Sequence, residues 1–189
     1  MKNIINNKLF LVVISLILIY VLYFGFLPYF EGFPSKEISK ILKLKSLDEK
    51  GVTEIHKILK NSYSLKVKEY AVYALKEIGD PSSIKILIDE FEYEGRWWVR
   101  WWDYEERYDV DAYHSTVARN LADIIEKTNK VNILYKELKN EDEDMRYWML
   151  YTLSFIEEEI DLTIIENIVK NDPSEKVKKL AVWVKKNKK

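Results

Sequence analysis

The sequence of 189 residues contains no cysteine, few glycines (5) and prolines (4), and only two histidines. The absence of cysteine excludes disulfide bonds, thiolate catalysis and cysteine-based metal sites. The scarcity of glycine and proline disfavours an architecture of tight β-hairpins. The formal net charge is -1 at pH 7, so the chain lacks the excess of lysine and arginine on which general nucleic-acid binding depends. We therefore predict no nucleic-acid partner.

The chain does contain a helical pattern of apolar residues that recurs four times. The four apolar stripes are Val67, Ala71, Ala74, Leu75 and Ile78; Val117, Leu121, Ile124 and Ile125; Met145, Met149, Leu153 and Ile156; and Val177, Ala181 and Val184. Spacings of three and four residues place each stripe on one face of an α-helix. A second, shorter apolar helix follows each of the first three stripes. The pattern therefore predicts an all-α array of helix pairs.

Residues at the helix ends support this array. Ser64 is an expected N-cap of the first stripe helix, and Gly79 an expected left-handed residue at its end. Asn129 is expected to cap a helix over residues 131–138, and Asp172 to cap the last helix. Lys68 lies beside the first stripe, and we expect its side chain to face solvent.

A family resemblance rests on residues 67–81, which read VKEYAVYALKEIGDP. They resemble a HEAT-like repeat of the phycobilisome-lyase type, which runs V-R-x-x-A-x-x-A-L-G-x-I-G-D and continues into proline and a second helix. The match is good over residues 64–93. Only the apolar register survives over 113–140 and 142–171, and the pattern ends after one helix at 173–187. The resemblance implies a short α-solenoid and protein binding, but no lyase activity, because none of the matching residues is catalytic.

The N-terminal part of the chain holds a long uncharged run, from residue 9 to residue 30. Its 22 residues would span ~33 Å as a helix, close to the hydrocarbon thickness of a bilayer. We predict an anchor over residues 1–30 with one transmembrane helix in the bilayer, and a linker over 31–35. A cleaved signal peptide is the alternative, although it would have a shorter apolar core. We expect an exported, extracytoplasmic domain, because the short basic leader resembles an export signal. The lysines after the linker favour a cytoplasmic domain, which is the alternative.

The stripes begin 50, 28 and 32 residues apart, which indicates an insertion in the first interval. We place it at about 94–111, within an α-solenoid domain over residues 36–189. Residues 95–111 read GRWWVRWWDYEERYDVD. Tryptophan and arginine dominate many binding hot spots. The candidate partner-binding residues are Trp98, Arg100, Trp102 and Arg107.

Two other interpretations of the insertion remain open. Indole rings stack on the apolar faces of sugars, so Trp97, Trp98, Trp101 and Trp102 could bind carbohydrate outside the cytoplasm. Aromatic stripes at helical spacing also pack in cores, as the first helix of a diverged repeat would.

No constellation of catalytic residues is evident. His56 and His114 lack a partner that the sequence places beside them, and we interpret both as structural. The acidic runs at 141–144 and 157–159 lack the spacing of a calcium loop. We predict no metal, no cofactor and no enzymatic activity. The sequence favours a membrane-anchored HEAT-repeat module that binds a protein partner through its concave face or the insertion. An extracytoplasmic carbohydrate or cell-wall binder is the alternative.

Overall fold

The computed structural model describes residue 15 and residues 34–45, 49–62, 64–93 and 104–188; for residues 34, 35, 49 and 104–109 it describes only the backbone. Within these ranges the chain forms helices and turns, without a strand. The helices are α2 (Pro34–Leu44), α3 (Glu49–Asn61), α4 (Leu65–Ile78), α5 (Ser83–Asp89), the 3-10 helix η1 (Glu90–Glu92), α6 (Tyr104–Thr128), α7 (Asn132–Glu137), α8 (Glu143–Leu153), α9 (Leu162–Asn171) and α10 (Glu175–Asn187).

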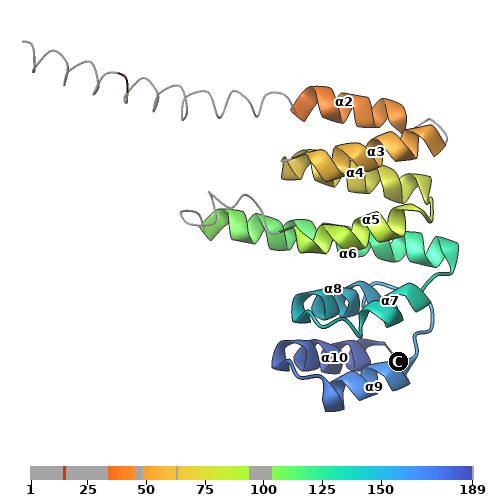
Figure 1. Cartoon of the computed structure of the whole chain (residues 1–189). Coiled ribbons are helices and arrows are strands. Elements are labelled where there is room, and N and C mark those ends of the chain that lie inside the picture. The colour runs from red at the N-terminus through yellow and green to blue at the C-terminus, as the bar shows by residue number, and fades with distance from the viewer. Residues whose placement is uncertain (1–14, 16–33, 46–48, 63, 94–103, 189) are drawn as a thin grey trace, which may run out of the picture.

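The helices stack in two layers (Figure 1). In the first layer α2, α4, α6, α8 and α10 follow one another, and each packs on the next. In the second layer α3, α5, α7 and α9 lie mainly against α4, α6, α8 and α10. This arrangement is compatible with an α-solenoid, in which each unit contacts only its neighbours.

The core lies between the layers and is built from the predicted apolar stripes. Every residue of the four stripes is buried except Ile78, which is half-buried. The first stripe helix also begins and ends as predicted. The Ser64 hydroxyl accepts a hydrogen bond from the Val67 amide at 3.4 Å, and Gly79 ends α4 with φ 71° in the left-handed region.

Three predictions about single residues are wrong. Asn129 does not cap α7; it follows α6 with φ 52°, and the residue before α7 is Val131. Asp172 does not start α10, because its carboxylate accepts two hydrogen bonds from Arg146 and one from the Ser174 amide. Lys68 does not face solvent and is 3% exposed.

Lys68 can be buried because three groups contact its ammonium group. Its Nζ lies 2.7 Å from the Leu59 carbonyl oxygen and 2.7 Å from Oε2 of Glu90. It also lies 4.7 Å from the centre of the Tyr93 ring, within the range of a cation–π contact. The Tyr113 hydroxyl donates to the same Glu90 oxygen at 2.7 Å. Burial, with the adjoining Glu90 carboxylate, raises the pKa of Tyr113, so this phenol stays protonated.

The fold-class prediction needs correction at the N-terminus. Across the described residues, no helix combines the length and apolar composition that crossing a membrane requires. The structure therefore supports the all-helical part of the prediction but not the transmembrane helix, and the single-pass membrane localisation loses its support. The predicted span over 9–30 lies outside the described residues except for Ser15, and of the predicted linker only residues 34 and 35 are described, as the start of α2.

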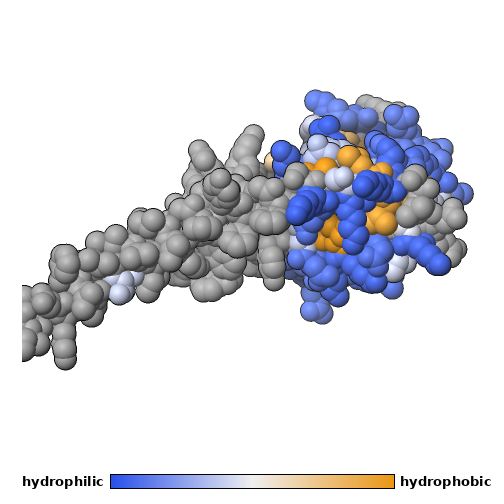
Figure 2. Space-filling model, turned by 90° about the horizontal axis from the view of Figure 1, so that it is seen from above, coloured by the Kyte–Doolittle hydropathy of each residue, from blue (hydrophilic) through white to orange (hydrophobic). Residues whose placement is uncertain are grey.

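Apolar side chains also reach the surface at the α2 end of the array. Figure 2 shows them gathered on this face and surrounded by polar side chains. Leu42 is 54% exposed, and Ile38, Leu44 and Ile58 are partly buried against the core. The first layer therefore starts with an incompletely covered helix.

Candidate binding groove between α7 and α9

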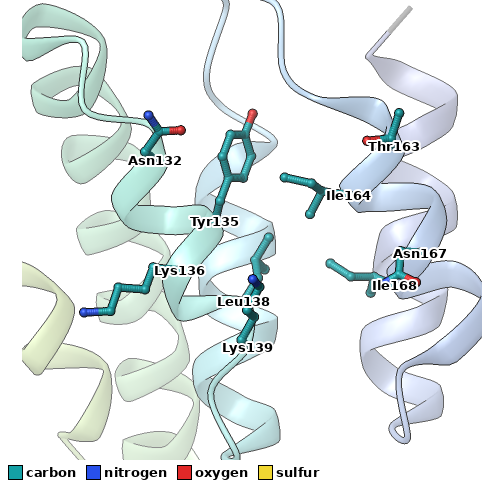
Figure 3. Close-up of a pocket in the computed structure, with 9 residues that line it drawn as sticks. All are labelled: Asn132, Tyr135, Lys136, Leu138, Lys139, Thr163, Ile164, Asn167 and Ile168. Carbon is teal, nitrogen blue, oxygen red and sulfur yellow. The ribbon is translucent and has the colours of Figure 1, made fainter.

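A groove of about 540 Å³ lies between the second-layer helices α7 and α9. Its lining residues are Asn132, Tyr135, Lys136, Leu138 and Lys139 on one side, and Thr163, Ile164, Asn167 and Ile168 on the other (Figure 3). The groove exists because α7 packs mainly on α8 and α9 packs mainly on α10. The two second-layer helices therefore stand apart instead of closing on each other.

Local sequence explains the separation of these helices. After α6 the left-handed residue Asn129 turns the chain, and α7 then runs for only 6 residues. Residues 154–161 join α8 to α9 without an α-helix. Asp161 then caps α9 by accepting a hydrogen bond from the Thr163 amide at 2.9 Å. The short α7 and the helix-free connection between α8 and α9 leave space that side chains do not fill.

The floor and walls of the groove are apolar. Leu138 and Ile168 are buried, whereas Tyr135 and Ile164 are half-buried. In Figure 3, Ile164 and Ile168 point from α9 toward Tyr135 and Leu138 on the other side of the groove. The Tyr135 hydroxyl accepts a hydrogen bond from the Asp161 amide at 2.8 Å and so ties α7 to the start of α9. The shape of the groove is therefore fixed by a contact between its two walls.

The rim of the groove carries exposed polar side chains. Thr163 donates its hydroxyl to Asp161 at 2.6 Å, and this hydrogen bond holds the pKa of the Asp161 carboxyl below its ordinary value. Oδ1 of Asn167 accepts a hydrogen bond from the Asn171 side chain at 2.7 Å. The side-chain NH2 group of Asn167 remains as a donor. Lys139 is exposed and forms no ion pair within the described residues. An apolar floor with a few polar groups at its edge is typical of a ligand-binding site.

The residues predicted to bind a partner are not those of the groove. Trp98, Arg100 and Trp102 lie outside the described residues. Arg107 lies in α6, of which the structure describes only the backbone at this position. The partner-binding role of the insertion stays a prediction. The sequence predicts binding through the concave face of the array but does not single out α7 and α9.

One side-chain pair resembles the start of a catalytic triad. His56 Nε2 lies 2.9 Å from Oγ of Ser83, and Asp80 is close enough to His56 to oppose the lowering of its pKa by burial. However, Ser83 is 0% exposed, so a substrate could not reach its hydroxyl. The Asp80 carboxylate instead accepts from the Ser82 amide at 2.7 Å. The pair therefore joins α3 to α5 and has no catalytic geometry.

His114 lies in an aromatic cluster rather than at a surface. It is 5% exposed, and its ring lies 5.7 Å from Phe91 and 5.1 Å from Trp148, both edge-on. Phe91 and Trp148 stack at 5.7 Å. Burial lowers the pKa of His114, and its Nε2 has no hydrogen-bond partner among the described residues. The cluster joins η1, α6 and α8 and is a packing feature.

The described residues contain no group of three or more His, Asp or Glu side chains placed to hold a metal ion. Comparison of the sequence with protein-family models and with curated proteins found no match. The groove is therefore interpreted from its own residues.

Proposed function

We propose that this chain is a HEAT-like α-solenoid that binds a protein partner, without catalysis, through the groove between α7 and α9. The observation that carries the proposal is the groove itself, with an apolar floor and exposed hydrogen-bonding groups along its rim. The two-layer stacking of helices supports a binding role, because helical arrays expose continuous surfaces of this kind.

The groove fits a segment of a partner protein that carries apolar side chains. Leu138, Ile164 and Ile168 would cover those side chains and remove them from water. The side-chain NH2 of Asn167 and the Thr163 hydroxyl would form hydrogen bonds with main-chain groups of the bound segment. The Tyr135–Asp161 hydrogen bond holds the two walls before binding, so little conformational entropy would be lost at the site.

Site-specific photocrosslinking in the full-length chain tests this proposal. A photoreactive amino acid at Asn167 lies in the groove, and one at Lys66 lies on the exposed face of α4. We expect a discrete protein adduct from position 167 and none of the same mass from position 66. Adding Ile164→Asp should reduce that adduct at least ~tenfold, since it places a charge on the apolar wall.

The control for the aspartate substitution is Leu42→Asp, at an exposed apolar position on α2. We expect this variant to keep the position-167 adduct at the wild-type level. Thermal melting of all variants separates loss of binding from loss of folding. The proposal is wrong if Ile164→Asp leaves the adduct unchanged, or if positions 66 and 167 capture the same proteins equally.

A further inference from the structure

The last helix of the array carries an apolar pair on its outer side. Val182 is 53% exposed and Trp183 is 51% exposed. Lys179 and Lys186 complete a stripe with the spacing i, i+3, i+4 and i+7, which is one face of an α-helix. We call Lys179, Val182, Trp183 and Lys186 the outer stripe of α10. At ~3.6 residues per turn, it lies opposite the buried face of the helix.

The buried face of α10 already has its partners within the array. It consists of Val177, Ala181 and Val184, and α10 packs on both α8 and α9. The outer stripe therefore occupies the place where a further first-layer helix would pack. A half-exposed tryptophan and valine at that position indicate a surface that a partner covers.

The lysines of α10 divide into two groups. Lys176 pairs with Asp144 at 2.7 Å and Lys185 pairs with Glu166 at 2.8 Å, so both attach α10 to neighbouring helices. Lys178 pairs with Glu175 within α10. By contrast, Lys179 and Lys186, on the outer stripe, form no ion pair with any described residue. Their positive charge is available to an acidic partner.

The array already joins first-layer helices by lysine–carboxylate pairs. Such pairs link α4 to α6 through Lys76 and Asp123 at 2.5 Å, and α8 to α10 through Lys176 and Asp144. Lys45, the residue after α2, pairs with Glu77 of α4. A helix that packed on the outer stripe with acidic residues facing Lys179 and Lys186 would continue the same pattern.

We infer that the outer stripe of α10 is a docking site for an acidic amphipathic α-helix of another protein, which adds to the end of the first layer. Val182 and Trp183 would pack against the apolar face of that helix. Lys179 and Lys186 would pair with carboxylates on either side of that face. This surface is distinct from the groove between α7 and α9, and the inference does not depend on the proposed function.

Charge argues against a second copy of this chain as the occupant. At the α2 end of another copy, Glu37 is the acidic residue of α2, and Glu54 and Glu77 already pair with Lys40 and Lys45. Two α10 helices would bring Lys179 and Lys186 against the same residues of the other copy. Lysines on both sides repel each other. The uncharged run over residues 9–30 offers no carboxylate either.

The test uses the full-length chain and a fluorescein-labelled synthetic peptide of about four helical turns. The peptide carries leucines at i, i+3, i+4 and i+7 and glutamates on both flanks of this face; a second peptide has lysines in place of the glutamates. Binding is followed by fluorescence anisotropy. We expect saturable binding of the glutamate peptide, weaker binding as salt is raised, and no binding of the lysine peptide.

Variants of the outer stripe should show the same dependence on charge. Lys179→Glu combined with Lys186→Glu should weaken binding of the glutamate peptide at least ~tenfold and allow the lysine peptide to bind. Trp183→Ala should weaken binding at least ~30-fold, as loss of a central tryptophan does. The control variant combines Lys66→Glu with Lys170→Glu, at exposed positions on α4 and α9, and should bind as the wild type does. Thermal melting checks that each variant is folded.

Three results would overturn the inference. The first is equal binding of the glutamate peptide by the wild type and the doubly charge-reversed variant. The second is dimerisation of the wild type in sedimentation experiments that Trp183→Ala abolishes, which would make a second copy the occupant. The third is Trp183-dependent binding to vesicles containing phosphatidylserine without binding of the peptide, which would make an anionic lipid surface the occupant.

Discussion

Lys68 and Arg146 occupy the same position in two copies of the apolar stripe, directly after Val67 and Met145. Both are buried in ion pairs, but the pairs are built differently. Arg146 donates to Asp172 through Nε at 2.9 Å and through a second nitrogen at 3.0 Å, and to the Asn140 and Glu141 carbonyls. Two of its partners lie in the turn before α8, and the third lies at the end of α9.

The Lys68 pair instead joins four elements. Lys68 of α4 bonds to the Leu59 carbonyl in α3 and to Glu90 in η1, and Tyr113 of α6 bonds to Glu90. The other two stripes have no such pair, since Ala118 follows Val117 and the half-buried Lys178 pairs within α10. The position of a residue in the stripe therefore determines that its side chain lies on the buried face of the helix. Whether a cation can be buried there depends on acceptors from segments distant in sequence.

We expect Asp172→Ala to lower the free energy of unfolding more than any other substitution considered below. This change leaves the Arg146 guanidinium buried without its counter-charge and removes the acceptor of the Ser174 amide. Loss of one partner from a buried pair typically costs about 3–5 kcal/mol, and we expect a loss in that range. Urea unfolding measures it. The control is Asp144→Ala, which breaks an exposed pair with Lys176 and should cost at most about 1 kcal/mol. Equal losses would show that the Arg146 pair is not a buried one.

We expect Lys68→Met to lower the free energy of unfolding by a smaller amount. Glu90 loses its cation but keeps the Tyr113 hydroxyl as a donor, so its carboxyl group stays partly satisfied. We expect the free energy of unfolding to fall by about 1–3 kcal/mol. Lys66→Met, at an exposed position of the same helix, should change it by no more than about 0.5 kcal/mol. If the two variants unfold alike, Lys68 faces solvent, as the sequence alone suggested.

Much of the fold follows from local sequence. The burial of the four stripes, the Ser64 cap and the left-handed Gly79 depend on helical periodicity and nearby residues, which a sequence shows directly. The predictions for Asn129, Lys68 and Asp172 are wrong because the side chain at each position can take more than one role. Asn caps helices but also tolerates left-handed backbone, and Asp caps helices but also pairs with arginine. The competing role wins when a distant partner is present.

The two candidate surfaces were harder to find from the sequence. The groove depends on the separation of α7 and α9, and the short α7 and the helix-free connection that produce this separation become visible only in the structure. The sequence shows that α10 is rich in lysine. Only the structure separates the lysines that pair within the fold from Lys179 and Lys186, and shows Trp183 half-exposed between them. The predicted Trp98, Arg100 and Trp102 contacts remain a prediction.

The smallest expected effect is the loss, in acid, of the stability that the Asp172 carboxylate contributes. Burial raises the pKa of the Asp172 carboxyl, but hydrogen bonds from Arg146 and the Ser174 amide outweigh burial and hold the pKa below its ordinary value. A carboxyl group with a lower pKa in the folded state adds stability above its unfolded pKa, about 3.9, and that stability is lost as the pH falls through the folded pKa. The difference in unfolding free energy between wild type and Asp172→Asn should therefore be constant near neutral pH and narrow below about pH 4. Urea unfolding at several pH values measures this difference. A gap that stays constant down to pH 2 would mean that the pKa of the Asp172 carboxyl is the same in the folded and unfolded states, so that Arg146 does not lower it.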